Sequence, residues 1–557
     1  MRTRLALIFS LTTLVIAACG SSDVLVRSEQ SDRIETTSLD GDPFESTTPV
    51  DPDDLAPVDA DPDDTADDTA DDTADDTADD EASTSTTLAD PIVSDPDAID
   101  FGSNKPERAY DDFLLATLSD IEAWLTDAYP AAYDEPWRPL EGGVYAGYPE
   151  RVEPIPGCGE ATTDYEDLQF FVAFYCPVGD FIVYDDGDEP IVFPGGVEQE
   201  PLLFSLAQRY GPATIGIVLA HEYGHAIQQR SGALDLGLPT VATEQQADCI
   251  SGAWAGRAAA GDAFGVPFSD GDVRAGLIAM IEVQDPVGTT PNVNGSHGSG
   301  FDRVGAFQVG FREGLSRCAE LIDAPLPLTP LNFLGTDDAA SGGNAPFGFD
   351  PPNGLFSFLV PDLNLYFDTD LEVVFPNFEP LELAPTQSIA EVDCDSPVGR
   401  YDDGAVLCPD TNTVYLNEPQ ARILYDEFGD FGPGYVIGTA WAEAAQRSTN
   451  SSLVGEARQL RNDCLTGAWV NSVIPVRDAN GELVLVEDPE TGLFRIQLPQ
   501  PRAEGRTASI SPNDLTEAIQ TAIIIGDENA SDDVIGSAFE KIDSFRRGTL
   551  DGITACT

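Results

Sequence analysis

The sequence has 557 residues, with 27 Lys and Arg residues against 99 Asp and Glu residues, and its formal net charge is −72. At roughly 150 residues per domain, this length supplies two or three domains with substantial hydrophobic cores. The charge excludes an electrostatic nucleic-acid binder, because such proteins neutralise phosphates with basic surfaces.

The N-terminus predicts an exported, lipid-anchored protein. A positively charged start precedes an apolar run from Leu5 to Ala18, which Cys19 follows. This run is too short to cross a bilayer core of roughly 30 Å, but it suits the apolar region of a signal peptide. Residues 16–19 resemble the lipobox of bacterial lipoproteins; the alternative is an ordinary secretory signal with an accidental cysteine. We expect a signal peptide over 1–18 and an acylated Cys19 that holds the protein on the extracytoplasmic side of the membrane.

Residues 19–100 predict a disordered acidic linker. Residues 20–100 contain 27 acidic residues and only two arginines, and Asp-Asp-Thr-Ala repeats from Asp63 to Ala78. Like charge and low hydrophobicity prevent this segment from offsetting chain entropy by burial. We expect a spacer between membrane and folded part, with calcium binding by the aspartates as the alternative.

The segment after Gly211-Pro212 predicts a helix that ends at Gly232. His221 and His225 lie four residues apart, so both imidazoles share one face and can meet one metal ion. With Glu222 beside His221, the spacing is the His-Glu-x-x-His arrangement of zincin metallopeptidases. We expect two zinc ligands and a general base, against the alternative of buried histidines bonded to backbone groups.

A second helix is predicted to begin at Thr243, where Thr243 and Gln246 are spaced as a capping box. Glu244 and Asp248 lie four residues apart on one face of this helix. A catalytic zinc needs a third protein ligand, which Glu244 would provide, and Asp248 would fix the tautomer of a ligand histidine. The alternative is a solvated acidic helix face.

The third histidine, His297, lies in the glycine-rich segment Gly-Ser-His-Gly-Ser-Gly. Backbone can approach a ligand closely there, so His297 is the candidate donor to a tetrahedral oxyanion, and Arg303 is a second candidate. A surface-loop histidine is the alternative.

Three blocks of the sequence occur twice, in the same order. Residues 174–184 are echoed by 406–415, residues 248–254 by 463–469, and residues 301–318 by 539–556. We therefore predict two related domains, 101–340 and 341–557, divided near the Gly/Pro-rich stretch 341–354. Apart from Cys19, the sequence has eight cysteines, which in an exported chain suggest four disulfides. Their matching order in both copies predicts the pairs Cys158–Cys176, Cys249–Cys318, Cys394–Cys408 and Cys464–Cys556.

The second copy is predicted to lack the metal ligands. Gly432-Pro433 is aligned with Gly211-Pro212, and Asp463-Cys464 with Asp248-Cys249. The residues then expected at the positions of His221, Glu222, His225, Glu244 and His297 are Ala442, Glu443, Gln446, Gln459 and Ile535. Without a ligand set this copy cannot hold a catalytic zinc of the same kind.

Residues 108–322 resemble the neutral zinc metallopeptidase family of bacterial envelope proteins. The resemblance rests on Phe-Tyr-Cys-Pro at 174–177, His-Glu-Tyr-Gly-His-Ala-Ile-Gln at 221–228, Glu-Gln-Gln-Ala-Asp-Cys at 244–249 and His-Gly-Ser-Gly at 297–300. It implies an α+β, zincin-like domain that carries one Zn²⁺ on His221, His225 and Glu244, followed here by a degenerate zincin-like domain.

The expected function is extracytoplasmic, zinc-dependent hydrolysis of a peptide or protein substrate. In the expected mechanism, Glu222 takes the proton of the attacking water and passes it to the leaving amine. One alternative is a non-catalytic binding or scaffold lipoprotein, which has no need for Glu222. Another is a metal-dependent hydrolase of a non-peptide amide such as peptidoglycan.

Overall fold

The structure, a computed structural model, describes residues 94–159, 162–163, 165–169, 171–192, 198–289, 295–329, 333, 339–398, 404–478, 483–487, 494–526 and 537–557. These residues belong to one compact unit with an α+β fold, which confirms the expected fold class. The predicted signal peptide, Cys19 and nearly all of the acidic linker lie outside them. Among the described residues, no helix combines the length and apolar character that crossing a bilayer requires.

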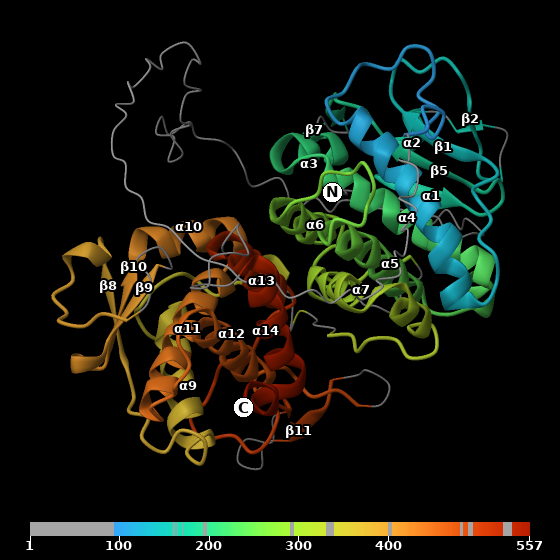
Figure 1. Cartoon of the computed structure of the whole chain (residues 1–557). Coiled ribbons are helices and arrows are strands. Elements are labelled where there is room, and N and C mark those ends of the chain that lie inside the picture. Colours follow the sequence, from blue (N-terminus) through green and yellow to red (C-terminus); the bar gives the residue numbers. More distant parts are fainter. Residues whose placement is uncertain are drawn as a thin grey trace, which may run out of the picture. The chain divides into compact units, whose positions relative to one another are not determined.

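The N-terminal half (residues 94–329) builds a small sheet covered by helices (Figure 1). Its principal elements are α1 (Asp111–Tyr133), β1 (Gly143–Gly147), β4 (Ala173–Cys176), β5 (Phe181–Asp185), α3 (Leu202–Tyr210), α4 (Ala213–Ser231), α5 (Thr240–Ala259), α6 (Asp270–Glu282) and α7 (Gly300–Glu320). Short elements fill its loops: β2 (Ile155–Pro156), β3 (Thr162–Thr163), α2 (Tyr165–Leu168), β6 (Ile191–Val192), β7 (Glu198–Gln199) and a 3₁₀ turn (Ala233–Leu236). The strand order is β1-β5-β4, with β1 parallel and β4 antiparallel to β5.

The C-terminal half (residues 339–557) repeats this plan. Its principal elements are α9 (Leu355–Leu365), β8 (Glu382–Thr386), β9 (Ala405–Cys408), β10 (Thr413–Asn417), α10 (Glu418–Phe428), α11 (Phe431–Ser448), α12 (Gly455–Asn471), α13 (Asp514–Ile525) and α14 (Ala538–Asp551). A hairpin of β11 (Leu485–Glu487) and β12 (Phe494–Ile496) is added after α12, and a 3₁₀ turn (Gly552–Cys556) follows α14. The strand order is β8-β10-β9, again with one parallel and one antiparallel pair.

The same contacts hold each half together. The indole of Trp254 on α5 donates to Asp120 on α1 at 3.1 Å, and Trp469 on α12 donates to Asp362 on α9 at 3.0 Å. The helix α4 packs on β4 and β5, as α11 packs on β9 and β10. Repeated sequence blocks therefore correspond to repeated structure.

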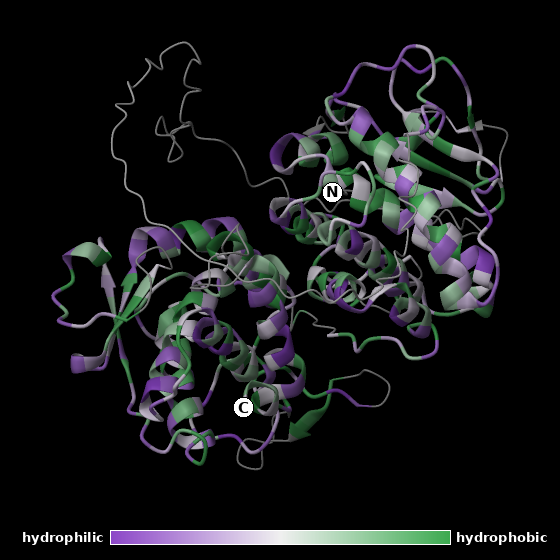
Figure 2. Cartoon of the chain, in the orientation of Figure 1, coloured by the Kyte–Doolittle hydropathy of each residue, from purple (hydrophilic) through white to green (hydrophobic). Residues whose placement is uncertain are grey.

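Apolar burial joins the two halves into one continuous core, which runs from Ile99 to Cys556. Strands β4 and β5 are buried at every position, and Figure 2 shows the apolar residues among the helices and strands. The closest helix packing depends on glycine, because a Cβ on Gly310 of α7 would lie 1.7 Å from the carbonyl oxygen of Cys249. Gly548 approaches Cys464 in the same way, at 2.0 Å.

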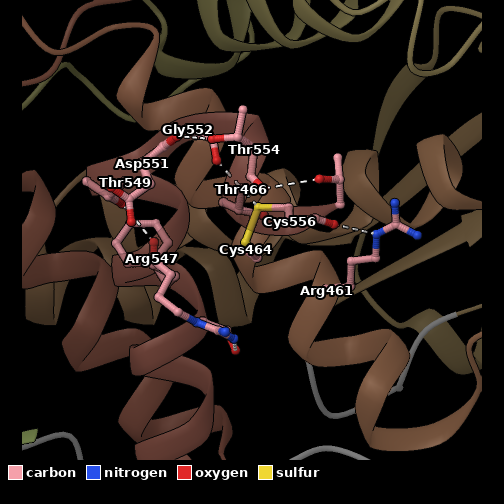
Figure 3. Close-up of a disulfide and its surroundings, with 12 residues drawn as sticks. Arg461, Cys464, Thr466, Arg547, Thr549, Asp551, Gly552, Thr554 and Cys556 are labelled. Carbon is pink, nitrogen blue, oxygen red and sulfur yellow. Dashed lines mark hydrogen bonds between the residues drawn. A yellow bond between two sulfur atoms is a disulfide. The ribbon is translucent and has the colours of Figure 1, made fainter.

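All four predicted disulfide pairs are joined in the structure. Cys158–Cys176 and Cys394–Cys408 each fix a segment to the end of a strand in the sheet, β4 or β9. Cys249–Cys318 ties α5 to α7, and Cys464–Cys556 ties α12 to the turn after α14. Figure 3 shows the last of these beside Arg461, whose guanidinium donates to the carbonyl oxygen of Cys556 at 2.9 Å.

The predicted start of the helix that carries Glu244 is wrong by one turn. The helix α5 begins at Thr240, directly after Pro239. Thr243 therefore lies inside the helix, where its hydroxyl donates to the carbonyl of Thr240 at 2.7 Å, and Gln246 donates to the carbonyl of Cys318 at 3.1 Å. A proline directly before the helix is compatible with this start, because the first helical N–H groups have no intrahelical acceptor and the proline removes no helix hydrogen bond.

Candidate metal centre and its cavity

The helix α4 brings the two predicted histidine ligands together. It ends where expected, at Gly232, which adopts a left-handed conformation (φ 78°) that glycine tolerates. His221 and His225 are buried on one face of this helix, and their Nε2 atoms lie 3.1 Å apart. Both imidazoles can therefore reach one metal ion.

The helix α5 places Glu244 beside both histidines. Its carboxylate oxygens lie 3.3 Å from His221 Nε2 and 3.6 Å from His225 Nε2, and the side chain is fully buried. Tetrahedral zinc with ligand distances near 2.0–2.1 Å separates its ligand atoms by about 3.3 Å. Among the described residues, none donates a hydrogen bond to either oxygen of Glu244. The donor set and its spacing thus fit a zinc ion.

Each ligand histidine is oriented by a buried partner. His221 Nδ1 lies 2.8 Å from Asp248 Oδ1, as expected, and His225 Nδ1 lies 2.9 Å from Gln228 Oε1. Such partners fix the ring so that Nε2 faces the metal. Gln228 was not identified from the sequence, although its spacing of three from His225 places both side chains on one helix face.

Arg303 of α7 stands behind Asp248 in an ion pair. Its Nε and Nη2 donate to the two carboxylate oxygens at 3.0 and 2.7 Å. Burial alone would raise the pKa of Asp248, but the charges and hydrogen bonds of Arg303 and His221 hold this pKa below its ordinary value. Arg303 also donates to the carbonyl of Val283. These bonds support the ligand His221 through Asp248, and the role of Arg303 as an oxyanion donor stays a prediction.

A small cavity joins the histidine ligand to the other predicted catalytic residues. It has a volume of about 10 Å³, and its polar lining is His221, Glu222, His297 and Arg303. Ala173, Val218, Met280 and Val283 form its apolar wall. A space of this size holds about one water molecule. The structure therefore brings Glu222 and His297 to the metal-ligand face, although 76 residues separate His221 from His297.

Asp285 holds the segment that carries His297. Its carboxylate accepts the backbone N–H groups of His297 and Gly298 at 2.9 and 2.8 Å and the Ser296 hydroxyl at 2.6 Å. His297 Nδ1 lies 3.2 Å from the other oxygen. Burial acts to raise the pKa of Asp285, but these hydrogen bonds outweigh it and the pKa lies below its ordinary value. Asp285 was missed from the sequence because no periodic pattern connects it to His297.

In the C-terminal half the predicted alignment of α11 with α4 is wrong by three residues. Gln446 donates to the carbonyl of Arg458 at 2.9 Å, just as Gln228 donates to that of Thr243 at 2.6 Å. Gln446 and Gln228 lie 218 residues apart. Gly429, which ends α10, and Gly211, which ends α3, are separated by the same 218 residues. The residues at the positions of His221, Glu222 and His225 are therefore Thr439, Ala440 and Glu443, and not Ala442, Glu443 and Gln446.

The corrected register still leaves this half without the ligand set. Glu443 pairs with Arg458, with the shortest distances at 2.8 Å, and accepts a hydrogen bond from Asn462 at 3.1 Å. Gln459 remains the counterpart of Glu244, and Ile535 lies outside the described residues. An ion pair thus occupies the place that corresponds to the candidate metal centre.

A separate group of buried carboxylates, Asp430, Asp514 and Glu517, lies at the N-termini of α11 and α13. Each accepts a backbone N–H group from residue 345, 511 or 431, respectively. Burial, followed by the charge of Asp430, raises the pKa of Glu517 well above its ordinary value. The bond to Glu517 satisfies the first N–H group of α11, and the bond to Asp514 lies just before α13.

Comparison with known proteins finds relatives in mycobacteria. Proteins described as uncharacterized, one from Mycobacterium bovis and others from two strains of Mycobacterium tuberculosis, are 31% identical to this chain over 203 residues. The match covers 32% of this chain and 64% of the length of each relative. No family model matches the chain. No solved structure matches it either.

Proposed function

We propose that the protein is a zinc-dependent peptidase of the neutral zinc metallopeptidase family, with its active site in the N-terminal half. One observation carries the proposal: His221, His225 and Glu244 converge with ligand atoms 3.1–3.6 Å apart in a buried site. A purely structural zinc is usually closed by four protein ligands, whereas a catalytic one keeps a position open. Glu222 beside the three-residue set favours the catalytic case.

The residues divide the proposed reaction between them. Zinc, when bound, would polarise the substrate carbonyl and lower the pKa of a water molecule. The Glu222 carboxylate accepts the proton of the attacking water and passes it to the nitrogen of the leaving amine. Asp285 orients the His297 ring through Nδ1, and this ring would donate a hydrogen bond to the oxyanion that develops on the substrate carbonyl oxygen. Asp248 and Gln228 keep the ligand histidines in place.

We further propose that the protein is exported and held at the extracytoplasmic face of the membrane by a lipid on Cys19. Four disulfides in one chain suit an oxidising compartment. The apolar run before Cys19 and the acidic linker after it would then serve as signal and spacer. Mass spectrometry of the N-terminal peptide from a bacterial expression host tests this, because a free or absent Cys19 contradicts the anchor.

The activity is tested by measuring zinc content and hydrolysis of casein and mixed peptides for the wild type and Glu222→Gln. We expect one zinc per chain in both proteins and hydrolysis by the wild type alone. Zinc in both without hydrolysis of any peptide would favour the scaffold alternative. Cleavage of muropeptides, without cleavage of casein or mixed peptides, would favour the alternative of a metal-dependent hydrolase that acts on a non-peptide amide such as peptidoglycan.

A further inference from the structure

The contact between α7 and α14 is reciprocal. Gln308 of α7 donates to the carbonyl of Phe539 at 2.9 Å, and Arg546 of α14 donates to the carbonyl of Phe301. Residues 301 and 539 correspond to each other in the internal repeat, as do 308 and 546, since each pair is 238 residues apart. Paired surfaces that exchange the same contact are the mark of a two-fold dimer interface. The two halves therefore pack like the subunits of a homodimer within one chain.

This contact reaches α7 at the turn that serves the candidate active site. Arg546 is buried, lies over the Phe301 ring at 4.1 Å, and fills the space beside Gly305, where a Cβ would lie 1.7 Å from its Nη2. Two residues after Phe301, Arg303 holds Asp248, which in turn holds the ligand His221. The C-terminal half thus fixes the backbone of the turn that carries Arg303.

A second contact reaches the His297 segment, defined here as residues 295–300. Thr516 of α13 donates to Gln284 Oε1 at 3.3 Å, and the same oxygen accepts the backbone N–H of Gly300 at 2.9 Å. A Cβ on Gly300 would lie 3.2 Å from Thr516 Cγ2, so the backbone packs directly against this side chain. The neighbour of Gln284 is Asp285, which accepts the N–H of His297. The C-terminal half therefore supports both ends of the connection between Asp285 and α7.

We propose that the C-terminal half, which lacks a counterpart of the His221, His225 and Glu244 set, acts as a built-in partner subunit that positions the His297 segment and Arg303 for the reaction of the N-terminal half. Thr516 and Arg546 are its positioning residues. The proposal rests on the proposed function for its catalytic consequence. The positioning itself does not depend on that function, because the C-terminal half would keep the His297 segment ordered whether or not the protein hydrolyses peptides.

The test measures hydrogen exchange in peptides that cover residues 295–303 of the full-length protein, together with zinc content, kcat and KM. Arg546→Leu removes the bond to Phe301, whereas Arg546→Gln can restore it, since Gln308 makes the corresponding bond in the other direction. We expect Arg546→Leu to speed hydrogen exchange of residues 295–303 at least tenfold and to lower kcat at least tenfold. KM and the single zinc should stay as in the wild type, and Arg546→Gln should recover both the exchange rate and kcat.

Thr516→Val supplies a milder variant if Arg546→Leu fails to fold. Its matched control is Thr521→Val, because Thr521 is also buried on α13 and its hydroxyl donates within that helix, to the carbonyl of Glu517 at 2.8 Å. Faster exchange at 295–303 in Thr516→Val but not in Thr521→Val supports the proposal. Unchanged exchange, or the same rise in both variants, overturns it. If the wild type hydrolyses no peptide, the proposed function fails while the exchange experiment still decides the positioning role.

Discussion

Asp248→Asn is the most informative substitution, because the internal repeat provides its own control. Asp248 is fully buried between His221 and Arg303, while its counterpart Asp463 is equally buried between the Tyr435 hydroxyl at 2.7 Å and Lys541 at 3.1 Å. Breaking a buried ion pair costs about 3–5 kcal/mol of the free energy of unfolding. We expect a loss of this order from either substitution.

Only Asp248→Asn should also weaken zinc binding. Removing a partner that orients a ligand histidine typically costs about 10–100-fold in metal affinity, which corresponds to about 1.4–2.8 kcal/mol. Zinc Kd values from competition with a chromophoric chelator, measured beside urea unfolding of the metal-free proteins, separate the two effects. An equal rise in Kd for Asp463→Asn, or an unchanged Kd for Asp248→Asn, would refute the reasoning.

Three further outcomes follow from particular contacts. His297→Ala should retain one zinc while kcat falls about 10²–10³-fold, as for the loss of one oxyanion donor; loss of zinc in this variant would show that His297 is a ligand or support instead. Burial raises the pKa of Asp185 to about 7. The folded carboxyl therefore keeps its proton at pH values where the unfolded one has lost it, and stability falls as the pH rises from about 4 to 7, by up to about 4 kcal/mol. Asp185→Asn should remove this part of the pH dependence in urea unfolding, and identical pH slopes for the two proteins would contradict the assignment. Gly310→Ala should lower the free energy of unfolding by at least about 1–3 kcal/mol because its Cβ meets the backbone of α5, whereas Gly271→Ala, which meets only the Ser269 hydroxyl at 3.5 Å, should be neutral or stabilising.

Spacing within single helices allows the sequence to predict which side chains of the candidate metal centre share a helix face. Residues four apart share a helix face, so His221 with His225, and Glu244 with Asp248, are paired by local geometry alone. Disulfide pairing was likewise predictable, since the order of cysteines is the same in both copies of the repeat.

The register of α11 could not be read from its proline. The Gly432-Pro433 pair looks like the start of the helix, but Pro433 is the third residue of α11, and Asp430 precedes the first. Proline is tolerated throughout the first turn, because the N–H groups there have no intrahelical acceptor. The match to Gly211-Pro212 therefore fixed the start only to within one turn.

Contacts between loop residues and between the two halves were also beyond the sequence. Asp285 and His297 lie on irregular backbone, where no period of 2 or 3.6 relates one side chain to another. The bond from Thr516 to Gln284 joins residues 232 positions apart. Such pairs follow from the packing of whole helices, which depends on the summed fit of many side chains.

Zinc binding by the wild type and Glu244→Gln, measured by native mass spectrometry of the full chain, tests the central claim most directly. The amide keeps the size of the side chain but removes the charge that the donor set supplies to the metal. We predict one zinc per wild-type chain and a loss of that zinc in Glu244→Gln at the same metal concentration. A wild-type chain that binds no zinc, or a variant that retains it as tightly, would contradict the assignment of His221, His225 and Glu244 as a metal centre.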